Sequence, residues 1–217
     1  DVPLATLGEV SLLPKVIPNS VILSPDGKYA FSALSDGTIH VWDVRGKGEL
    51  RVVRPPAFTT EAELSRLAIN SAGNRLVVAV KTRIGVQKYT DVVVYQINEL
   101  GNLDELPYQT RMHGAPVNLR FADQDRALLV MSEEEVRLAE FNDLQKRLDN
   151  KWTIDTPTYL VGDAVLTPNG ERLIVATCQG PGREQISECS YAAIFDTRTK
   201  QEVGRLSGHS WYITSID

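Results

Sequence analysis

The sequence is poor in the side chains that most often carry metal and redox chemistry. It contains two cysteines, three histidines and two methionines among 217 residues. No histidine has a second histidine or a cysteine at the spacing typical of metal ligands, which argues against a zinc site. We therefore expect no metal site and no cofactor.

Long hydrophobic runs and an excess of basic charge are also missing. No window reaches the roughly 18 to 20 consecutive apolar residues that a membrane helix needs. The formal net charge of −5, from 23 basic and 28 acidic residues, disfavours the nucleic-acid backbone as a partner. We expect neither a membrane span nor a nucleic-acid partner.

Short catalytic motifs are absent as well. There is no Gly-x-Ser-x-Gly elbow, and Gln179-Gly180-Pro181-Gly182 lacks the lysine and hydroxyl residue of a phosphate-binding loop. The acidic run Glu133 to Glu135 is interpreted as a solvated turn between two strands, with cation binding as the less favoured alternative. We assign no catalytic residue and expect no enzyme, although a triad built from residues distant in sequence is left open.

What the sequence does contain is one pattern repeated four times. In each copy an apolar strand runs into a tight turn, and the copies are offset by 46, 52 and 45 residues. Three copies place glycine at the same turn position, where a positive φ is expected, and the third copy has Asp125 there. The four segments are Val21 to Gly27, Leu67 to Gly73, Leu119 to Asp125 and Ala164 to Gly170.

Three further strands are expected after each turn. Second strands are predicted at 29–34, 76–80, 128–131 and 173–177, and third strands at 38–42, 92–97, 136–141 and 191–195. More polar fourth strands are predicted at 49–54, 106–111, 151–156 and 202–206. Residues 61–66 are expected to form a short helical turn, and 142–149 have helix-favouring composition, with a strand as the alternative.

A spacing of about 40 to 50 residues is typical of four-stranded propeller blades. The sequence therefore predicts an all-β fold, a single β-propeller segment over 1–217. Its blades are expected at 17–56, 64–111, 116–157 and 160–207, with 208–217 as the first strand of another blade. An aromatic residue recurs in the third strand at Trp42, Tyr95 and Phe195, with Ala139 as the exception, and is interpreted as core packing between blades.

The run from Ser35 to Asp43, Ser-Asp-Gly-Thr-Ile-His-Val-Trp-Asp, resembles the closing signature of a WD40 repeat. Gly208-His209 resembles the Gly-His opening of such a repeat, and His113 and His209 each lie four residues before an apolar strand residue. The resemblance is specific in the first unit and degenerate in the others. It is also compatible with a divergent propeller of the YVTN-like group.

This resemblance implies roles for several residues. In the family a histidine, an aspartate, a serine or threonine and a tryptophan form a buried hydrogen-bond network, and Ser32, Asp36 and Trp42 match three of those positions. No histidine precedes the first unit, so the full set is not expected in one blade, and His40 is expected to face outward. The other positions that match the family's structural pattern are Gly37, Asp43, His113, Gly208 and His209.

Four blades and one extra strand do not close a ring of about seven blades. We expect the remaining blades to come from the same longer chain or from a partner chain. An open sheet edge at each end of such a segment would otherwise invite aggregation.

The two cysteines flank a ten-residue loop, Gln179 to Glu188. A disulfide between Cys178 and Cys189 would close this loop and stabilise the fold by roughly 3 kcal/mol, and it would imply an oxidising compartment. Two free thiols in a cytoplasmic protein are the alternative, and the sequence does not decide between them. A cytoplasmic location is favoured, and an extracytoplasmic one is expected if the disulfide forms.

The leading functional hypothesis is a non-catalytic propeller that acts as a protein-interaction scaffold or as a regulatory or sensor domain. The alternative is an extracytoplasmic propeller that binds a small ligand, or acts as an enzyme, at its central channel with residues such as His113. The loops that depart most from the repeat, Lys81 to Asp91 and Gln179 to Glu188, are expected to contact a protein partner. Their candidate contact residues are Lys81, Arg83, Lys88, Tyr89, Arg183, Glu184 and Gln185.

Overall fold

The computed structural model describes residues 16–46, 51–54, 62–155, 159–179, 191–208, 213 and 216. The regular structure of these residues is β-strand, arranged as four sheets of four strands each. The strands are β1 Pro18–Leu23, β2 Tyr29–Leu34, β3 Ile39–Asp43, β4 Arg51–Val53, β5 Glu63–Ile69, β6 Arg75–Ile84, β7 Gln87–Ile97, β8 Leu103–His113, β9 Pro116–Ala122, β10 Ala127–Ser132, β11 Glu135–Asn142, β12 Arg147–Asp155, β13 Tyr159–Leu166, β14 Arg172–Gln179, β15 Tyr191–Asp196 and β16 Glu202–Leu206.

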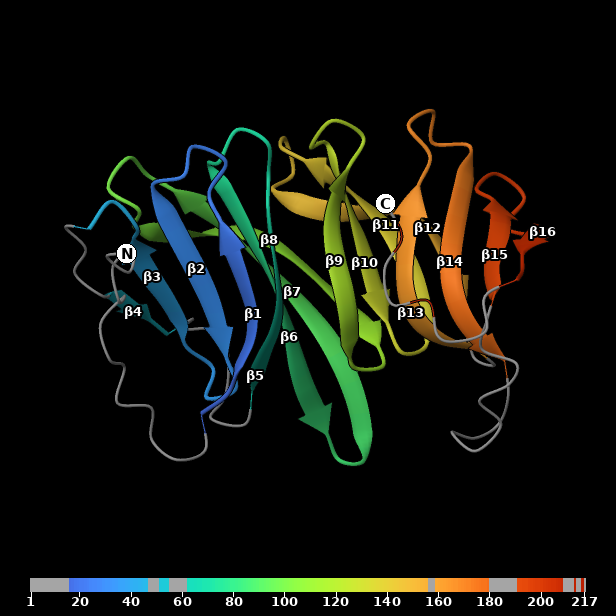
Figure 1. Cartoon of the computed structure of the whole chain (residues 1–217), viewed down its shortest axis with the longest axis horizontal. Coiled ribbons are helices and arrows are strands. Elements are labelled where there is room, and N and C mark those ends of the chain that lie inside the picture. Colours follow the sequence, from blue (N-terminus) through green and yellow to red (C-terminus); the bar gives the residue numbers. More distant parts are fainter. Residues whose placement is uncertain are drawn as a thin grey trace, which may run out of the picture.

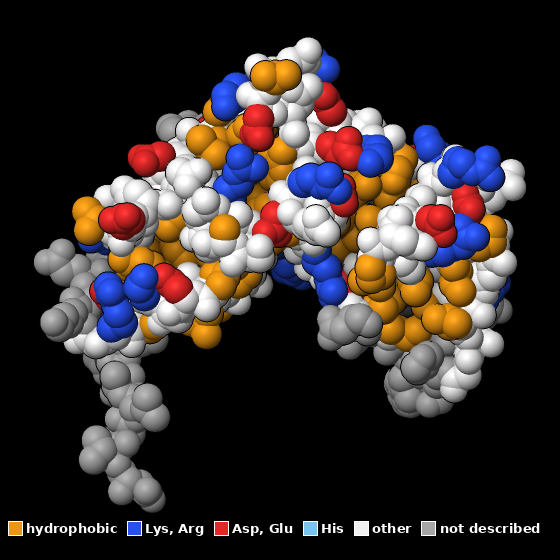
Figure 2. All heavy atoms as spheres, turned by 90° about the horizontal axis from the view of Figure 1, so that it is seen from above, with side chains coloured by type: hydrophobic (Ala, Val, Ile, Leu, Met, Phe, Trp, Pro, Cys, Tyr) orange, Lys and Arg blue, Asp and Glu red, His pale blue; other side chains and the backbone are white. Residues whose placement is uncertain are grey.

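Each sheet is an antiparallel meander in which the strands pair in the order of the sequence (Figure 1). The sheets β1–β4, β5–β8, β9–β12 and β13–β16 are called the first to the fourth blade below. Each blade packs against the next, and neighbouring blades meet along their first strands, β1 on β5, β5 on β9 and β9 on β13. The molecule is an open arch (Figure 2). The prediction of an all-β propeller segment is confirmed.

Three apolar clusters fill the spaces between neighbouring blades. Phe31 and Leu76 lie in the cluster between the first and second blades, and both are fully buried. Val77 and Leu128 belong to the second cluster, and Leu129 and Leu173 to the third. Burying one such side chain contributes about 1.5–3 kcal/mol, so the fold is stabilised mainly across the blade interfaces.

The turn between the first and second strands has the same backbone conformation in all four blades. Gly27, Gly73, Asp125 and Gly170 have φ values of 69°, 70°, 68° and 71°. The predicted equivalence of these positions is confirmed, including the aspartate. Asp125 gains a compensating contact with the second blade, because its carboxylate accepts a hydrogen bond from the Ser71 backbone N–H at 2.8 Å.

Gly73→Ala is expected to destabilise the fold more than Gly170→Ala. Both changes force a side chain into a positive φ, which costs about 1–2 kcal/mol. A Cβ at Gly73 would also lie 3.2 Å from Pro25 Cδ, whereas a Cβ at Gly170 meets no described atom within 4 Å. The difference in urea midpoints between the two variants measures the cost of placing a Cβ against Pro25. Equal midpoints would show that this close contact costs nothing.

The repeated aromatic position lies on the face that each blade turns toward the preceding one. Tyr95 and Phe195 belong to the clusters on that side, as does Ala139. The interpretation as core packing is confirmed for Tyr95 and Phe195 but not for Trp42, which belongs to none of the clusters. Trp42 occupies the same position in the first blade, and it alternates along β3 with Val41, which faces the second blade. Trp42 is therefore on the outer face of the first blade, where it is half-buried.

The first strands are also linked by polar contacts at one repeated position. The residues at this position are Ser20, Arg66, Asn118 and Asp163. The Leu67 N–H donates to Ser20 Oγ at 3.2 Å, Arg66 Nε donates to the Val117 carbonyl at 2.6 Å, and Asn118 Nδ2 donates to Asp163 Oδ1 at 2.7 Å. Asp163 in turn accepts the Ile216 N–H at 2.9 Å, so this position links each of the four first strands to a later segment of the chain.

Two secondary-structure predictions need correction. The helical turn expected at 61–66 is wrong, because Glu63–Ile69 is strand β5. Leu64 and Leu67 are buried in the first cluster, so packing between blades overrides the local helix preference. In the region 142–149 the strand alternative holds, since β11 and β12 meet there through a turn that places Lys146 at a φ of 53°.

Candidate functional site

The second blade carries the feature that departs most from the repeat. Strands β6 and β7 have 10 and 11 residues, whereas β2 and β10 in the neighbouring blades have six each. Their pairing continues through Arg83 with Lys88 and Ile84 with Gln87, and the chain turns at Gly85 and Val86. The prediction of a loop from Lys81 to Asp91 is therefore wrong: this segment is a β-hairpin that projects beyond the other blades (Figure 1).

An ion pair between a largely buried aspartate and an exposed arginine fixes the base of this hairpin. The Asp91 side chain is largely buried and accepts hydrogen bonds from Thr82 Oγ1 at 2.7 Å and from Arg111 Nε at 2.6 Å. The hydrogen bond to Asp91 raises the pKa of Arg111 above its ordinary value. Because Thr82, Asp91 and Arg111 lie on β6, β7 and β8, one carboxylate joins all three strands.

Two aromatic rings extend this cluster. The Arg111 guanidinium lies 5.6 Å from the centre of the Tyr89 ring, and the Tyr89 and His113 rings are 5.3 Å apart. The Thr90 hydroxyl donates to the Gly114 carbonyl at 2.9 Å, just beyond the end of β8. His113 therefore contacts the base of the hairpin through the Tyr89 ring.

The hairpin is also tied to the third blade. Lys88 forms an ion pair with Glu133 at 3.1 Å, and the His113 N–H donates to Glu135 Oε1 at 2.9 Å. Arg137 donates to the Arg111 carbonyl at 2.9 Å and pairs with Glu135 at 3.2 Å. Glu135 is buried, so the prediction of a solvated acidic turn is wrong for this residue.

The tip of the hairpin is apolar and exposed. Ile84 and Val86 have 55% and 93% of their surface accessible. Arg83 is exposed beside them, and it takes part in no ion pair within the described part of the chain. The hairpin thus combines a base held by ion pairs with a tip that presents two aliphatic side chains and a cation.

The predicted contact residues divide accordingly. Lys81 pairs with Glu63 at 2.7 Å, and Lys88 and Tyr89 belong to the base, so these three position the hairpin. Arg83 lies at the tip. Arg183, Glu184 and Gln185 are outside the described residues, as are Cys189 and His209. Cys178 lies on β14 and its pairing with Cys189 stays a prediction.

Ile84 and Val86 were not among the contact residues predicted from the sequence. The signal was present, because an apolar residue on either side of Gly85 with polar residues beyond is compatible with two strands and a tight turn. The departure from the repeat spacing instead suggested an inserted loop.

The WD40-like residues of the first blade are only partly brought together. The Trp42 indole N–H donates to Ser32 Oγ at 3.4 Å. The Asp36 carboxylate instead accepts hydrogen bonds from the N–H and hydroxyl of Thr38, at 3.0 and 2.6 Å, which closes the turn that contains Gly37 at a φ of 81°. Asp43 is bound by Arg45, whose hydrogen bonds lower the pKa of Asp43 to about 2. Gly208 lies just after β16 and is exposed.

His40 lies on the outer face of the first blade, as expected, but it is buried there. Its side chain is 7% exposed and lies on the same face as Trp42, with 6.2 Å between the ring centres. Burial lowers the pKa of His40 below 6.5, and the nearby Asp36 carboxylate acts in the opposite direction. His40 therefore favours its neutral form in the folded chain.

Because the folded pKa of His40 is lower than the unfolded one, the unfolded chain binds the proton more readily. Stability is therefore expected to fall as the pH decreases through 6.5 toward the lowered value, and His40→Gln should remove this step. Urea midpoints at about pH 7.5 and about pH 5 measure it. His113→Gln, at an exposed histidine, is the control and should keep the step. The same pH profile in His40→Gln and the unmodified chain would contradict the prediction.

No group of three or more histidine, cysteine, aspartate or glutamate side chains in the described ranges is arranged to hold a metal ion. Within those ranges there is also no helix long and apolar enough to cross a membrane.

Comparisons with known proteins agree with this fold. Residues 14–43 match the family model "WD domain, G-beta repeat". Among solved structures, the β-propeller domain of Myceliophteria thermophila Cps50 (Swd1) is similar, with a TM-score of 0.61 and 15% identity over 94% of this chain. Kuenenia stuttgartiensis hydrazine synthase is similar with a TM-score of 0.62 and 14% identity over 93% of this chain.

The chain spans 60% and 53% of the length of these two structures. A comparison with curated proteins gave no match. At such low identity the likeness to solved structures shows the fold alone. The four blades show a β-propeller segment, and its first unit matches a WD40 repeat.

Proposed function

We propose that this WD40-type segment is part of a non-catalytic interaction scaffold or sensor, and that the β6–β7 hairpin is its main contact with a protein partner. The observation that carries the proposal is an exposed aliphatic tip on a rigid base. A flexible insertion would need no buried carboxylate across three strands, whereas Asp91 binds both Thr82 and Arg111.

The energetics of binding favour such a hairpin. Ordering a loop on binding costs about 0.5–1.5 kcal/mol for each side chain that is immobilised. Here the strands are already paired up to Ile84 and Gln87, so that cost is low. Ile84 and Val86 would enter an apolar groove on the partner, and Arg83 would meet an acidic residue at its edge.

The remaining features are compatible with this role. A central-channel enzyme would need converging catalytic groups, and His113, the residue proposed for that alternative, is used to support the hairpin. We propose a cytoplasmic location. Two free thiols at Cys178 and Cys189 would support it, and a disulfide between them would contradict it.

A photo-crosslinking amino acid at position 86 tests the hairpin in the full-length protein. The matched control is the same amino acid at position 144, because Leu144 and Val86 are 97% and 93% exposed. A discrete protein adduct is expected from position 86 alone. Equal adducts from both positions, or none from position 86, would contradict the proposal.

The affinity for the crosslinked partner then tests the tip directly. The double change Ile84→Ser and Val86→Ser should weaken binding about tenfold or more, as loss of central apolar anchors does. Leu144→Ser should bind like the unmodified protein. Unchanged affinity in the double variant would refute the assignment even if the adduct forms.

A further inference from the structure

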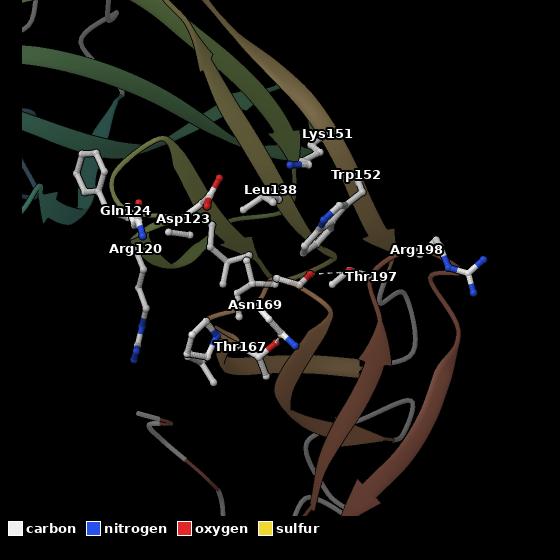
Figure 3. Close-up of a pocket in the computed structure, with 17 residues that line it drawn as sticks. Arg120, Asp123, Gln124, Leu138, Lys151, Trp152, Thr167, Asn169, Thr197 and Arg198 are labelled. Atoms are coloured by element: carbon white, nitrogen blue, oxygen red, sulfur yellow. Dashed lines mark hydrogen bonds between the residues drawn. The ribbon is translucent and has the colours of Figure 1, made fainter.

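A pocket of about 680 Å³ lies between the third and fourth blades, at the edge opposite the hairpin (Figure 3). Its walls are the turns after β9 and β13, which contain Asp123 and Asn169, and the turn after β15, which contains Arg198. This volume is within the range of about 300–1,000 Å³ that is typical of ligand sites.

The pocket is a departure from the repeat. Between the first and second blades the equivalent turns touch, because a Cβ at Gly73 would lie 3.2 Å from Pro25. Between the second and third blades they are joined by the hydrogen bond from Ser71 to Asp125. At Gly170 no described atom of the preceding turn comes within 4 Å of the Cβ position. The third interface is thus left open where the other two are closed.

The floor of the pocket is apolar and contains one accessible hydrogen-bond donor. Leu129, Leu138 and Trp152 line it with 1%, 3% and 7% of their surface exposed. Figure 3 shows the Trp152 indole directed into the pocket. Among the hydrogen bonds of the described residues none involves its N–H, and this atom is not among the buried polar atoms that lack a partner, so solvent or a ligand can reach it. The indole can only donate, so a ligand group that binds it is an acceptor.

The charges around the pocket favour an anion. Arg120, Lys151 and Arg198 line it, whereas its one acidic residue, Asp123, is neutralised by Arg126 at 2.6 Å. Arg120 is bound to Asp163 and Lys151 to Glu140, so both are held in place and their charges are compensated, as that of Asp123 is. Arg198 is exposed at the rim and forms no ion pair with another described residue. Arg198 therefore leaves one uncompensated positive charge at the rim.

The polar side chains at the mouth leave few free hydrogen-bonding groups for a highly polar small molecule. Thr167 Oγ1 donates to Asn169 Oδ1, and Thr197 Oγ1 donates to the Gly170 carbonyl, each at 2.7 Å. These groups are used within their own turns. Because exposed residues such as Gln124, Asn169 and Arg198 form the mouth, a chain can enter and leave the pocket across the surface.

We propose that this pocket binds an acidic peptide segment of a partner protein. An aliphatic side chain of the peptide packs on Leu129 and Leu138, and an adjacent carboxylate accepts the Trp152 N–H. Arg198 pairs with a second acidic residue of the peptide. The site is separate from the hairpin, so it stands whether or not the hairpin binds a protein.

The test is a titration of the full-length protein with the peptide acetyl-Gly-Leu-Asp-Leu-Glu-Gly-amide. Binding is followed by the indole signal of Trp152 in a proton–nitrogen correlation spectrum, assigned by its loss in Trp152→Phe. Saturable movement of this signal is expected below about 5 mM peptide, and a peptide with Asn and Gln in place of Asp and Glu should move it far less. No movement, or equal movement with both peptides, overturns the proposal.

Variants distinguish binding in the pocket from nonspecific electrostatic attraction of the peptide. Trp152→Phe keeps the aromatic floor and should weaken binding about tenfold, measured by fluorescence polarisation of a dye-labelled peptide. Arg198→Glu should weaken it about fivefold. Arg54→Glu makes the same charge change in the first blade, at an exposed residue outside both the pocket and the hairpin, and should leave binding unchanged. Equal loss in Arg54→Glu and Arg198→Glu would show that only net charge attracts the peptide, and would overturn the assignment of the pocket.

Discussion

Asp163→Asn is expected to lower the free energy of unfolding by about 3 kcal/mol, because it removes a buried charge that four donors share. Asp163 is 1% exposed and lies 2.6 Å from Arg120 across the interface of the third and fourth blades. It also accepts Asn118 Nδ2, its neighbour Ala164 N–H and the Ile216 N–H. An asparagine can replace one acceptor oxygen, but its amide nitrogen faces donors on the other side.

The loss is expected to be below the maximum for a fully buried pair, since the Arg120 side chain is 28% exposed and can reach water. Urea unfolding measures the change in midpoint. Glu140→Gln is the control, because the Lys151–Glu140 pair is 49% and 40% exposed and should contribute less than about 1 kcal/mol. If Asp163→Asn unfolds within about 1 kcal/mol of the unmodified chain, the polar links between first strands carry little of the stability.

Leu128→Ala should destabilise the chain by about 2–5 kcal/mol, since it leaves a cavity between the second and third blades. Leu128 is fully buried, and Leu76 and Leu173 occupy the same repeat position at the other two interfaces, also fully buried. The first blade has Ala30 at this position, on its outer face. A leucine is thus found wherever the position faces a preceding blade.

The same change at an exposed leucine provides the control. Leu144 is 97% exposed, and Leu144→Ala should change stability by less than about 0.5 kcal/mol. Equal midpoints for Leu128→Ala and Leu144→Ala would indicate that the interface rearranges to fill the space, and the repeat position would then have no special role in packing.

Much of the fold could be predicted because each blade repeats the same local requirements. The positive φ after each first strand favours glycine or aspartate, so Gly27 and Asp125 could be aligned despite their different chemistry. The burial of Tyr95 and Phe195 could likewise be inferred from their common position.

The hairpin and the pocket could not be predicted in the same way. The length of β6 and β7 depends on ion pairs such as Asp91 with Arg111, which join residues distant in sequence. The burial of His40 and Glu135 likewise depends on neighbouring strands and not on local polarity. The pocket arises because two turns fail to meet near Gly170, and each of those turns has an ordinary sequence.

The outer face of the first blade matters for the behaviour of the purified segment. Val21 and Leu23 are 66% and 59% exposed there, beside the half-buried Trp42. The two ends of the arch are different surfaces, so two copies that meet end to end form a heterologous contact. Such head-to-tail contacts either close into a ring or continue as a fibre. Because kosmotropic salts strengthen apolar contacts, dilution rather than added salt should keep the segment monomeric when it is prepared alone.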